Sequence, residues 1–181
     1  MGEQEISPPP APEEVGASSS KHEPGEELVA QLVCAMDHIP RHGWLEVGET
    51  RPEVIDLIEG SVTRSTIIHD RVRTHYRQRH PETQQSDIEK AAIRTLMNPD
   101  RAMVDLKYRN TVNVFRRLND AEDVMVSLEI SADPGKSNRI KSIRTYPRRR
   151  TEELLTDKRR VGSKWPEGGS ATPAGAETDQ P

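Results

Sequence analysis

The sequence has few of the residues that build disulfides, large cores or membrane spans. It contains one cysteine, Cys34, so no disulfide can form within the chain, which favours a reducing, cytoplasmic location. No apolar run approaches the length of a membrane span, and the N-terminus lacks the pattern of a Sec-type signal peptide. Because Cys34 lies in an apolar helical run, we expect it to be a small core residue.

Apolar residues are also scarce, at 32% of the 181 residues, and aromatics make up 3%. Much of this deficit lies at the two ends, which are rich in Pro, Gly, Ser, Thr and Glu. Segments of this composition cannot bury enough apolar surface to offset the entropy of ordering. We therefore expect a disordered, acidic, Pro-rich tail at 1–25, a single domain at 26–150, and a charged and then disordered tail at 151–181.

Charge is distributed unevenly along the chain. Residues 1–60 carry 3 Lys and Arg against 13 Asp and Glu, a net charge of −10. Residues 61–150 carry 19 against 11, a net charge of +8, and residues 151–181 carry 4 against 6, a net charge of −2. A basic centre favours a polyanionic partner, because binding releases the counterions of the polyanion. RNA is the partner that we expect.

Four helices are predicted before residue 100. Apolar residues at a spacing of four mark helices over 26–38 and 61–80, and the latter ends near Pro81. Two capping boxes, each with a Glu three residues after a Thr or Ser, begin a short helix at about 52–58 and another that runs from about 86 to 97.

After residue 100 the apolar period changes from about 3.6 to 2, which indicates strands. Alternation predicts strands over about 103–108, 111–117, 123–130 and 139–146, separated by short turns. The sequence therefore predicts an α+β domain in which N-terminal helices pack on a four-stranded antiparallel β-meander.

The same region gathers groups that suit RNA cleavage. Imidazoles can transfer protons near neutral pH, and guanidinium and ammonium groups can stabilise the charge of a phosphorane. The candidate catalytic residues are His75, His80, Thr145 and Tyr146. The candidate nucleic-acid-binding residues are Arg73, Arg77, Arg79, Arg139, Lys141, Arg144 and Arg148. Pro40 interrupts any helix that would align His38 with His42, and Arg41 and Arg79 beside the candidate ligands would repel a cation, so neither a metal nor a cofactor is expected.

The order of four short motifs resembles the phage-type members of the barnase–EndoU–colicin–RelE nuclease superfamily. The motifs are the run His75-Tyr-Arg-Gln-Arg-His-Pro-Glu82, then Asp87-Ile-Glu89, then Met97-Asn-Pro-Asp100, and last Ile143-Arg-Thr-Tyr146. The resemblance covers roughly residues 65–147 and implies a nuclease-like core over 62–147. It also implies a metal-independent ribonuclease with His75, His80, Arg144 and Thr145 at functional positions, and a toxin or phage-associated effector with a protein inhibitor.

Several alternatives remain open on the sequence. A second run, His38-Ile-Pro-Arg-His42, is similar to the histidine motif and competes with it for the functional role. The basic centre also suits a nucleic-acid-binding module without catalysis. The acidic N-terminal region and the tails suit a protein-interaction adaptor.

The expected domain limits predict the outcome of limited proteolysis under native conditions. Both ends should be removed, and a fragment of roughly residues 26–150 should resist cleavage because its backbone is packed and hydrogen-bonded. Mass spectrometry of the resistant fragment would locate its ends. Cleavage within 102–146 would contradict the predicted sheet.

Overall fold

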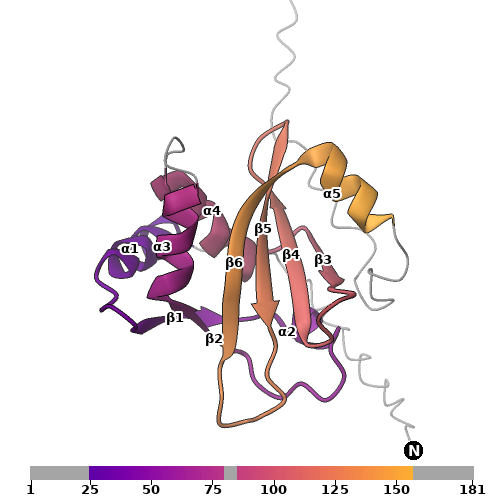
Figure 1. The fold of residues 1–181 in the computed structure, drawn as a ribbon, viewed down its shortest axis with the longest axis horizontal. Coiled ribbons are helices and arrows are strands. Elements are labelled where there is room, and N and C mark those ends of the chain that lie inside the picture. The colour runs from indigo at the N-terminus through magenta and orange to yellow at the C-terminus, as the bar shows by residue number, and fades with distance from the viewer. Residues whose placement is uncertain (1–24, 80–84, 157–181) are drawn as a thin grey trace, which may run out of the picture.

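A six-stranded mixed sheet with helices on both faces makes up residues 25–79 and 85–156, which are the residues described by this computed structural model (Figure 1). The predicted α+β class is therefore confirmed. The helices are α1 (Glu26–Asp37), α2 (Pro52–Ile55), α3 (Asp70–Arg79), α4 (Gln85–Met97) and α5 (Arg148–Leu155). The strands are β1 (Trp44–Glu49), β2 (Ser65–His69), β3 (Arg101–Val104), β4 (Thr111–Arg117), β5 (Glu122–Glu129) and β6 (Asn138–Pro147).

The structure describes little of the two expected tails, and its elements extend beyond the expected end of the domain. Residues 1–24 and 157–181, which contain most of the two expected tails, lie outside the described residues. The domain boundary expected at residue 150 falls inside α5, so the ordered elements continue past it.

The sheet contains more strands than the sequence predicted. Its order is β1-β2-β6-β5-β4-β3, with β2 and β6 parallel and the other neighbouring pairs antiparallel. Strands are present near all four expected positions, as β3 to β6, but the first, expected over about 103–108, is instead Arg101–Val104. The predicted four-stranded antiparallel meander is nevertheless wrong, because β1 and β2 extend the sheet beside β6.

The first half of the helix predicted over 61–80 is also wrong, because β2 occupies 65–69 and α3 begins only at Asp70. Ile68 in β2 and Val72 and Tyr76 in α3 are all buried, and their spacing of four resembles one continuous helical face. The β-branched run Thr66-Ile67-Ile68 instead favours an extended backbone, since branching at Cβ restricts χ1 in a helix.

The second missed strand, β1, lies at an edge of the sheet. Its pairing with β2 shifts register between Glu46 and Gly48, and Gly48 has a φ of 115°. A residue with a side chain rarely adopts that angle, so glycine permits the irregularity. This break interrupts the alternation that would have revealed the strand.

Helices cover the two faces of the sheet unequally (Figure 1). On one face, α1, α3 and α4 pack on alternate residues of the sheet, including Val124, Val126 and Leu128. On the other face, α5 contributes Leu154 and Leu155 to a smaller cluster, whose buried members are Met103, Phe115 and Met125. The larger cluster is therefore the main core, and it lies beneath α1, α3 and α4.

Cys34 does not belong to that core, so the expectation that it is a core residue is wrong. Its side chain is exposed, whereas Val29, Val33 and Met36 form the buried face of α1. Cys34 directly follows Val33, and a helix turns by roughly 100° per residue, which carries Cys34 away from the core.

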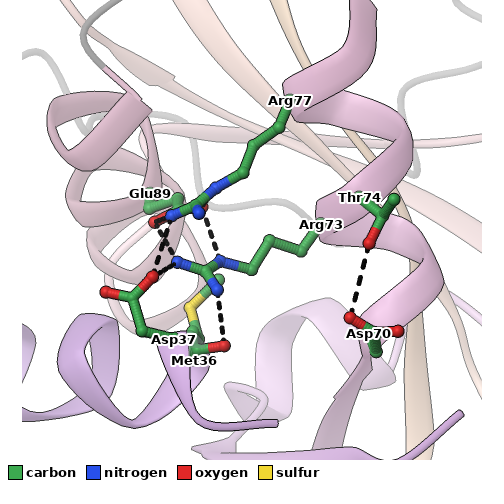
Figure 2. A network of polar contacts seen from close by, with 7 residues as sticks. All are labelled: Met36, Asp37, Asp70, Arg73, Thr74, Arg77 and Glu89. Carbon is green, nitrogen blue, oxygen red and sulfur yellow. Dashed lines mark hydrogen bonds and ion pairs between the residues drawn. The ribbon is translucent and has the colours of Figure 1, made fainter. Parts of the chain in front are cut away.

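A charged network joins α1, α3 and α4 (Figure 2). Arg73 Nε donates to Glu89 Oε1 at 2.8 Å, and Arg77 Nε donates to the same oxygen at 3.0 Å. Both arginines also bond Asp37, and Arg73 Nη1 donates to the Met36 carbonyl at 2.7 Å. These cations lower the pKa of the Asp37 carboxyl, and the hydrogen bond from Arg73 is the largest cause.

Burial makes the network important for stability. The Glu89 side chain is 1% exposed and that of Arg73 is 9% exposed, so neither charge is well solvated. Removing one partner from such a pair leaves the other charge buried without full compensation. The orientation of α3 against α1 and α4 therefore depends on these ions.

We expect Arg73→Ala to lower the free energy of unfolding by about 3–5 kcal/mol, the range observed when one partner of a buried ion pair is removed. The matched control is Arg149→Ala, because Arg149 is 91% exposed and pairs with Glu153 one helical turn away. That change should cost about 0.5 kcal/mol or less. Urea denaturation followed by circular dichroism measures both, and equal losses would contradict the role of the network.

Candidate functional site

A groove of about 540 Å³ lies between α3 and β6. The pairing of β2 with β6 covers Asn138 and Arg139, and β2 then ends and leads directly into α3. Beyond that point α3 takes the place of a neighbouring strand beside β6 (Figure 1). The groove is lined by Arg71, Val72, His75, Tyr76, Arg79, Lys141, Ser142, Ile143, Arg144 and Thr145.

The helical wall carries a stripe of exposed cationic and imidazole groups. Arg71, His75 and Arg79 are spaced by four, so they lie on one face of α3. The buried residues Val72 and Tyr76 anchor this face to the core. Of the sequence-predicted residues, His75 and Arg79 therefore lie in the groove.

Two other predicted residues of α3 do not lie in the groove. Arg73 and Arg77 were expected to bind nucleic acid, but in the structure both pair with Glu89 and Asp37, and neither lines the groove. They follow the groove residues by two positions, which is roughly 200° of helix rotation, so they lie on the opposite side of α3. Their role in the structure is to hold the helices together.

The strand wall includes three predicted residues: Lys141, Arg144 and Thr145. Ser142 pairs with Ser127 and Ile140 pairs with Leu128, so Lys141 is an extra residue in β6, a bulge that projects from the regular ladder. Because the pairing with β2 has ended, side chains from both faces of β6 reach the groove. Thr145 is half-buried, while Lys141 and Arg144 are exposed.

The remaining predicted residues lie elsewhere. Tyr146 packs against the cluster under α5, so the groove does not contain its phenol. Arg139 is paired with Glu129 at 2.7 Å and lines a different hollow. Arg148 lies on α5 and pairs with Glu152 at 3.3 Å. The structure therefore places none of these three residues in the groove beside the histidine-bearing helix.

Two histidine motifs, at 38–42 and at 75–80, compete for the functional role, and the structure describes only some of their histidines. His80 lies outside the described residues. His38 and His42 are exposed in the connection between α1 and β1, and neither lines the groove. Among the described histidines, His75 is therefore the one that the fold places against β6.

The groove is suited to an anion. Its lining combines the four cations Arg71, Arg79, Lys141 and Arg144 with one imidazole and no carboxylate. Guanidinium groups bind phosphate oxygens through directed, charge-assisted hydrogen bonds. The sequence analysis missed Arg71 and Tyr76, although the spacing of Arg71 from His75 and Arg79 was a signal that could have found Arg71.

A second, smaller hollow of about 260 Å³ lies beneath α5 and includes Asp123 and Arg148. Burial raises the pKa of the Asp123 carboxyl, while the Thr151 hydroxyl and the Arg148 and Arg117 cations oppose the shift. Acidic and basic side chains are mixed here, in contrast to the groove beside α3. Arg148 therefore faces carboxylates of its own chain.

Residues 25–79 and 85–156 contain no group of three or more His, Cys, Asp or Glu side chains that could hold a metal ion. No helix within these ranges is long and apolar enough to cross a bilayer.

Comparison of the chain with protein-family models, with curated protein sequences and with solved structures finds no match.

The environment of Asp123 predicts a pH-dependent effect on stability. A raised pKa means that the folded chain binds this proton more tightly than the unfolded chain does. The ionised carboxylate therefore lowers stability at pH 7, and this penalty disappears as the pH falls through the folded-state pKa. We expect Asp123→Asn to be at least as stable as the wild type at pH 7 and to lose any advantage in acid.

Urea titrations of both proteins between pH 7 and pH 3 would measure the difference. A variant that is less stable than the wild type at pH 7, by a difference that shrinks in acid, would show that Asp123 stabilises the fold as an anion.

Proposed function

We propose that this protein is a metal-independent endoribonuclease that cleaves RNA by attack of a 2′-hydroxyl on the adjacent phosphate. One observation carries the proposal. The fold places the imidazole of His75 on one wall of a cationic groove, and Lys141, Arg144 and Thr145 on the other. The proposed partner is therefore RNA, and a cytoplasmic location and a protein inhibitor that covers the groove belong to the same proposal.

The chemistry assigns a role to each wall. The 2′-oxygen forms a bond to phosphorus, the bond from phosphorus to the 5′-oxygen breaks, and the products carry a 2′,3′-cyclic phosphate and a 5′-hydroxyl. His75 transfers one proton, either from the attacking 2′-hydroxyl or to the leaving 5′-oxygen, and solvent water carries the other, so the proton lost by the 2′-hydroxyl is balanced by the one gained at the 5′-oxygen. Lys141 and Arg144 stabilise the negative charge on the phosphorane, and Thr145 positions a phosphate oxygen through its hydroxyl.

The charge of the groove supports phosphate binding independently of catalysis. Four cations line it without a carboxylate, so several phosphates of one strand would gain favourable contacts. Binding through phosphates releases counterions and weakens steeply as salt concentration rises. The same cations would repel a divalent metal ion, which is why the proposed reaction uses proton transfer alone.

A second candidate function is RNA binding without cleavage. The observation that favours it is that the described lining contains one imidazole, whereas transesterification requires both a proton acceptor and a proton donor. In this alternative, His75 contributes only a hydrogen bond or a positive charge to the phosphate surface. The two candidates predict the same binding and differ in turnover.

We expect His75→Ala to reduce the rate of RNA cleavage by about a hundredfold to ten-thousandfold, the usual cost of losing a general acid or base. The exposed position of His75 means that the variant should remain folded by circular dichroism. His38→Ala is the matched control, because His38 is also exposed and lies outside the groove. Cleavage of end-labelled RNA and detection of 2′,3′-cyclic phosphate ends measure both variants.

Chelation by EDTA should leave the wild-type rate unchanged. If the wild type leaves RNA intact with and without divalent metals but binds it in a salt-dependent manner, the enzyme proposal fails and the binding module replaces it. If His38→Ala reduces cleavage as much as His75→Ala does, the assignment of the site to this groove fails.

A further inference from the structure

An exposed tyrosine lies just beyond the strand wall of the groove. Five of the six aromatic residues lie in the described part of the chain. Tyr76 and Phe115 are buried and Tyr146 is partly buried, whereas Tyr108 is 46% exposed on the connection between β3 and β4. Trp44 is exposed as well, at 58%, but Tyr108 is the exposed aromatic whose ring has lysine side chains beside it.

The backbone around Tyr108 is held in place by the connection itself. Asp105 Oδ1 accepts hydrogen bonds from the Lys107 and Tyr108 backbone N–H groups at 2.8 Å and 3.2 Å. Asp105 Oδ2 accepts another from the Asn113 side chain at 3.3 Å, and the Thr111 N–H donates to the Tyr108 carbonyl at 2.9 Å. The backbone position of Tyr108 is therefore set before any ligand arrives, which reduces the entropy lost on binding.

Cations connect this ring to the groove. Lys141 Nζ lies 4.4 Å from the centroid of the Tyr108 ring, and Lys107 Nζ lies 5.2 Å from it. Lys141 also lines the groove, so one lysine side chain separates the aromatic ring from the proposed phosphate site. Exposed aromatic rings beside cations are the combination that single-stranded nucleic acids bind, through base stacking and phosphate contacts.

We infer that Tyr108 is a stacking platform for a base of single-stranded RNA whose neighbouring phosphate lies in the groove between α3 and β6. This inference rests on the proposed function and adds the substrate class to it, because a paired and stacked base in a duplex cannot lie on the ring. Lys141 then contacts the phosphate that joins the stacked nucleotide to the one in the groove.

Binding of a 2′-O-methyl RNA oligonucleotide tests the inference without turnover, since the attacking hydroxyl is blocked. Tyr108→Ala should raise the Kd by roughly fivefold to a hundredfold, the cost of losing one base–aromatic stack. Tyr108→Phe should stay within about twofold of the wild type, because it keeps the ring. Trp44→Ala is the matched control, since Trp44 is 58% exposed on β1 and does not line the groove.

A strand of the same length built from abasic ribose units separates stacking from an effect through Lys141. Without bases, wild type and Tyr108→Ala should bind equally if the ring stacks on a base. If Tyr108→Ala weakens both strands equally, the ring only positions Lys141 and the inference is overturned. The same holds if it weakens neither strand, or no more than Trp44→Ala does. Failure of the wild type to bind either strand would instead overturn the proposed function together with this inference.

Discussion

The ion pairs between α3 and its neighbours fix which face of that helix meets β6. Helix α3 carries two sets of cations on roughly opposite sides, Arg73 and Arg77 on one and Arg71 and Arg79 on the other. The buried Glu89 accepts hydrogen bonds from the first set and thereby commits it to the interior. The second set, with His75 between its members, is left to form the wall of the groove. Glu89 on α4 thus determines which side chains of α3 line the groove, although Glu89 itself is not among the lining residues.

The end of the β2–β6 pairing is the second constraint on the groove. A continued parallel ladder would have covered the edge of β6, and its side chains would have faced the two sides of a closed sheet. Because β2 leads into α3 after His69, a helix of larger diameter follows the strand, and a groove remains between them. The bulge at Lys141 lies at this uncovered edge, where an extra residue does not disturb a second ladder.

Much of the fold could be predicted because its patterns are local. Strands β4 to β6 and helices α1 and α4 have clean periods, and the order of a histidine-bearing helix before a strand with Thr145 was read correctly. The sequence could not show that Arg73 pairs with a carboxylate, because its partner Glu89 lies 16 residues later and meets Arg73 only in the folded chain. Strand β2 was missed because Ile68 continues the helical spacing of Val72 and Tyr76.

The two walls of the groove are made at different times, because α3 precedes β6 in the chain by roughly sixty residues. A growing polypeptide that has completed α3 has the imidazole wall alone, and the cations and hydroxyl of β6 arrive only with the last strand of the sheet. If the groove cleaves RNA, a partly synthesised chain has an incomplete site. Under the proposed function, this order would keep a complete site from forming near the messenger and ribosome until β6 has joined the sheet.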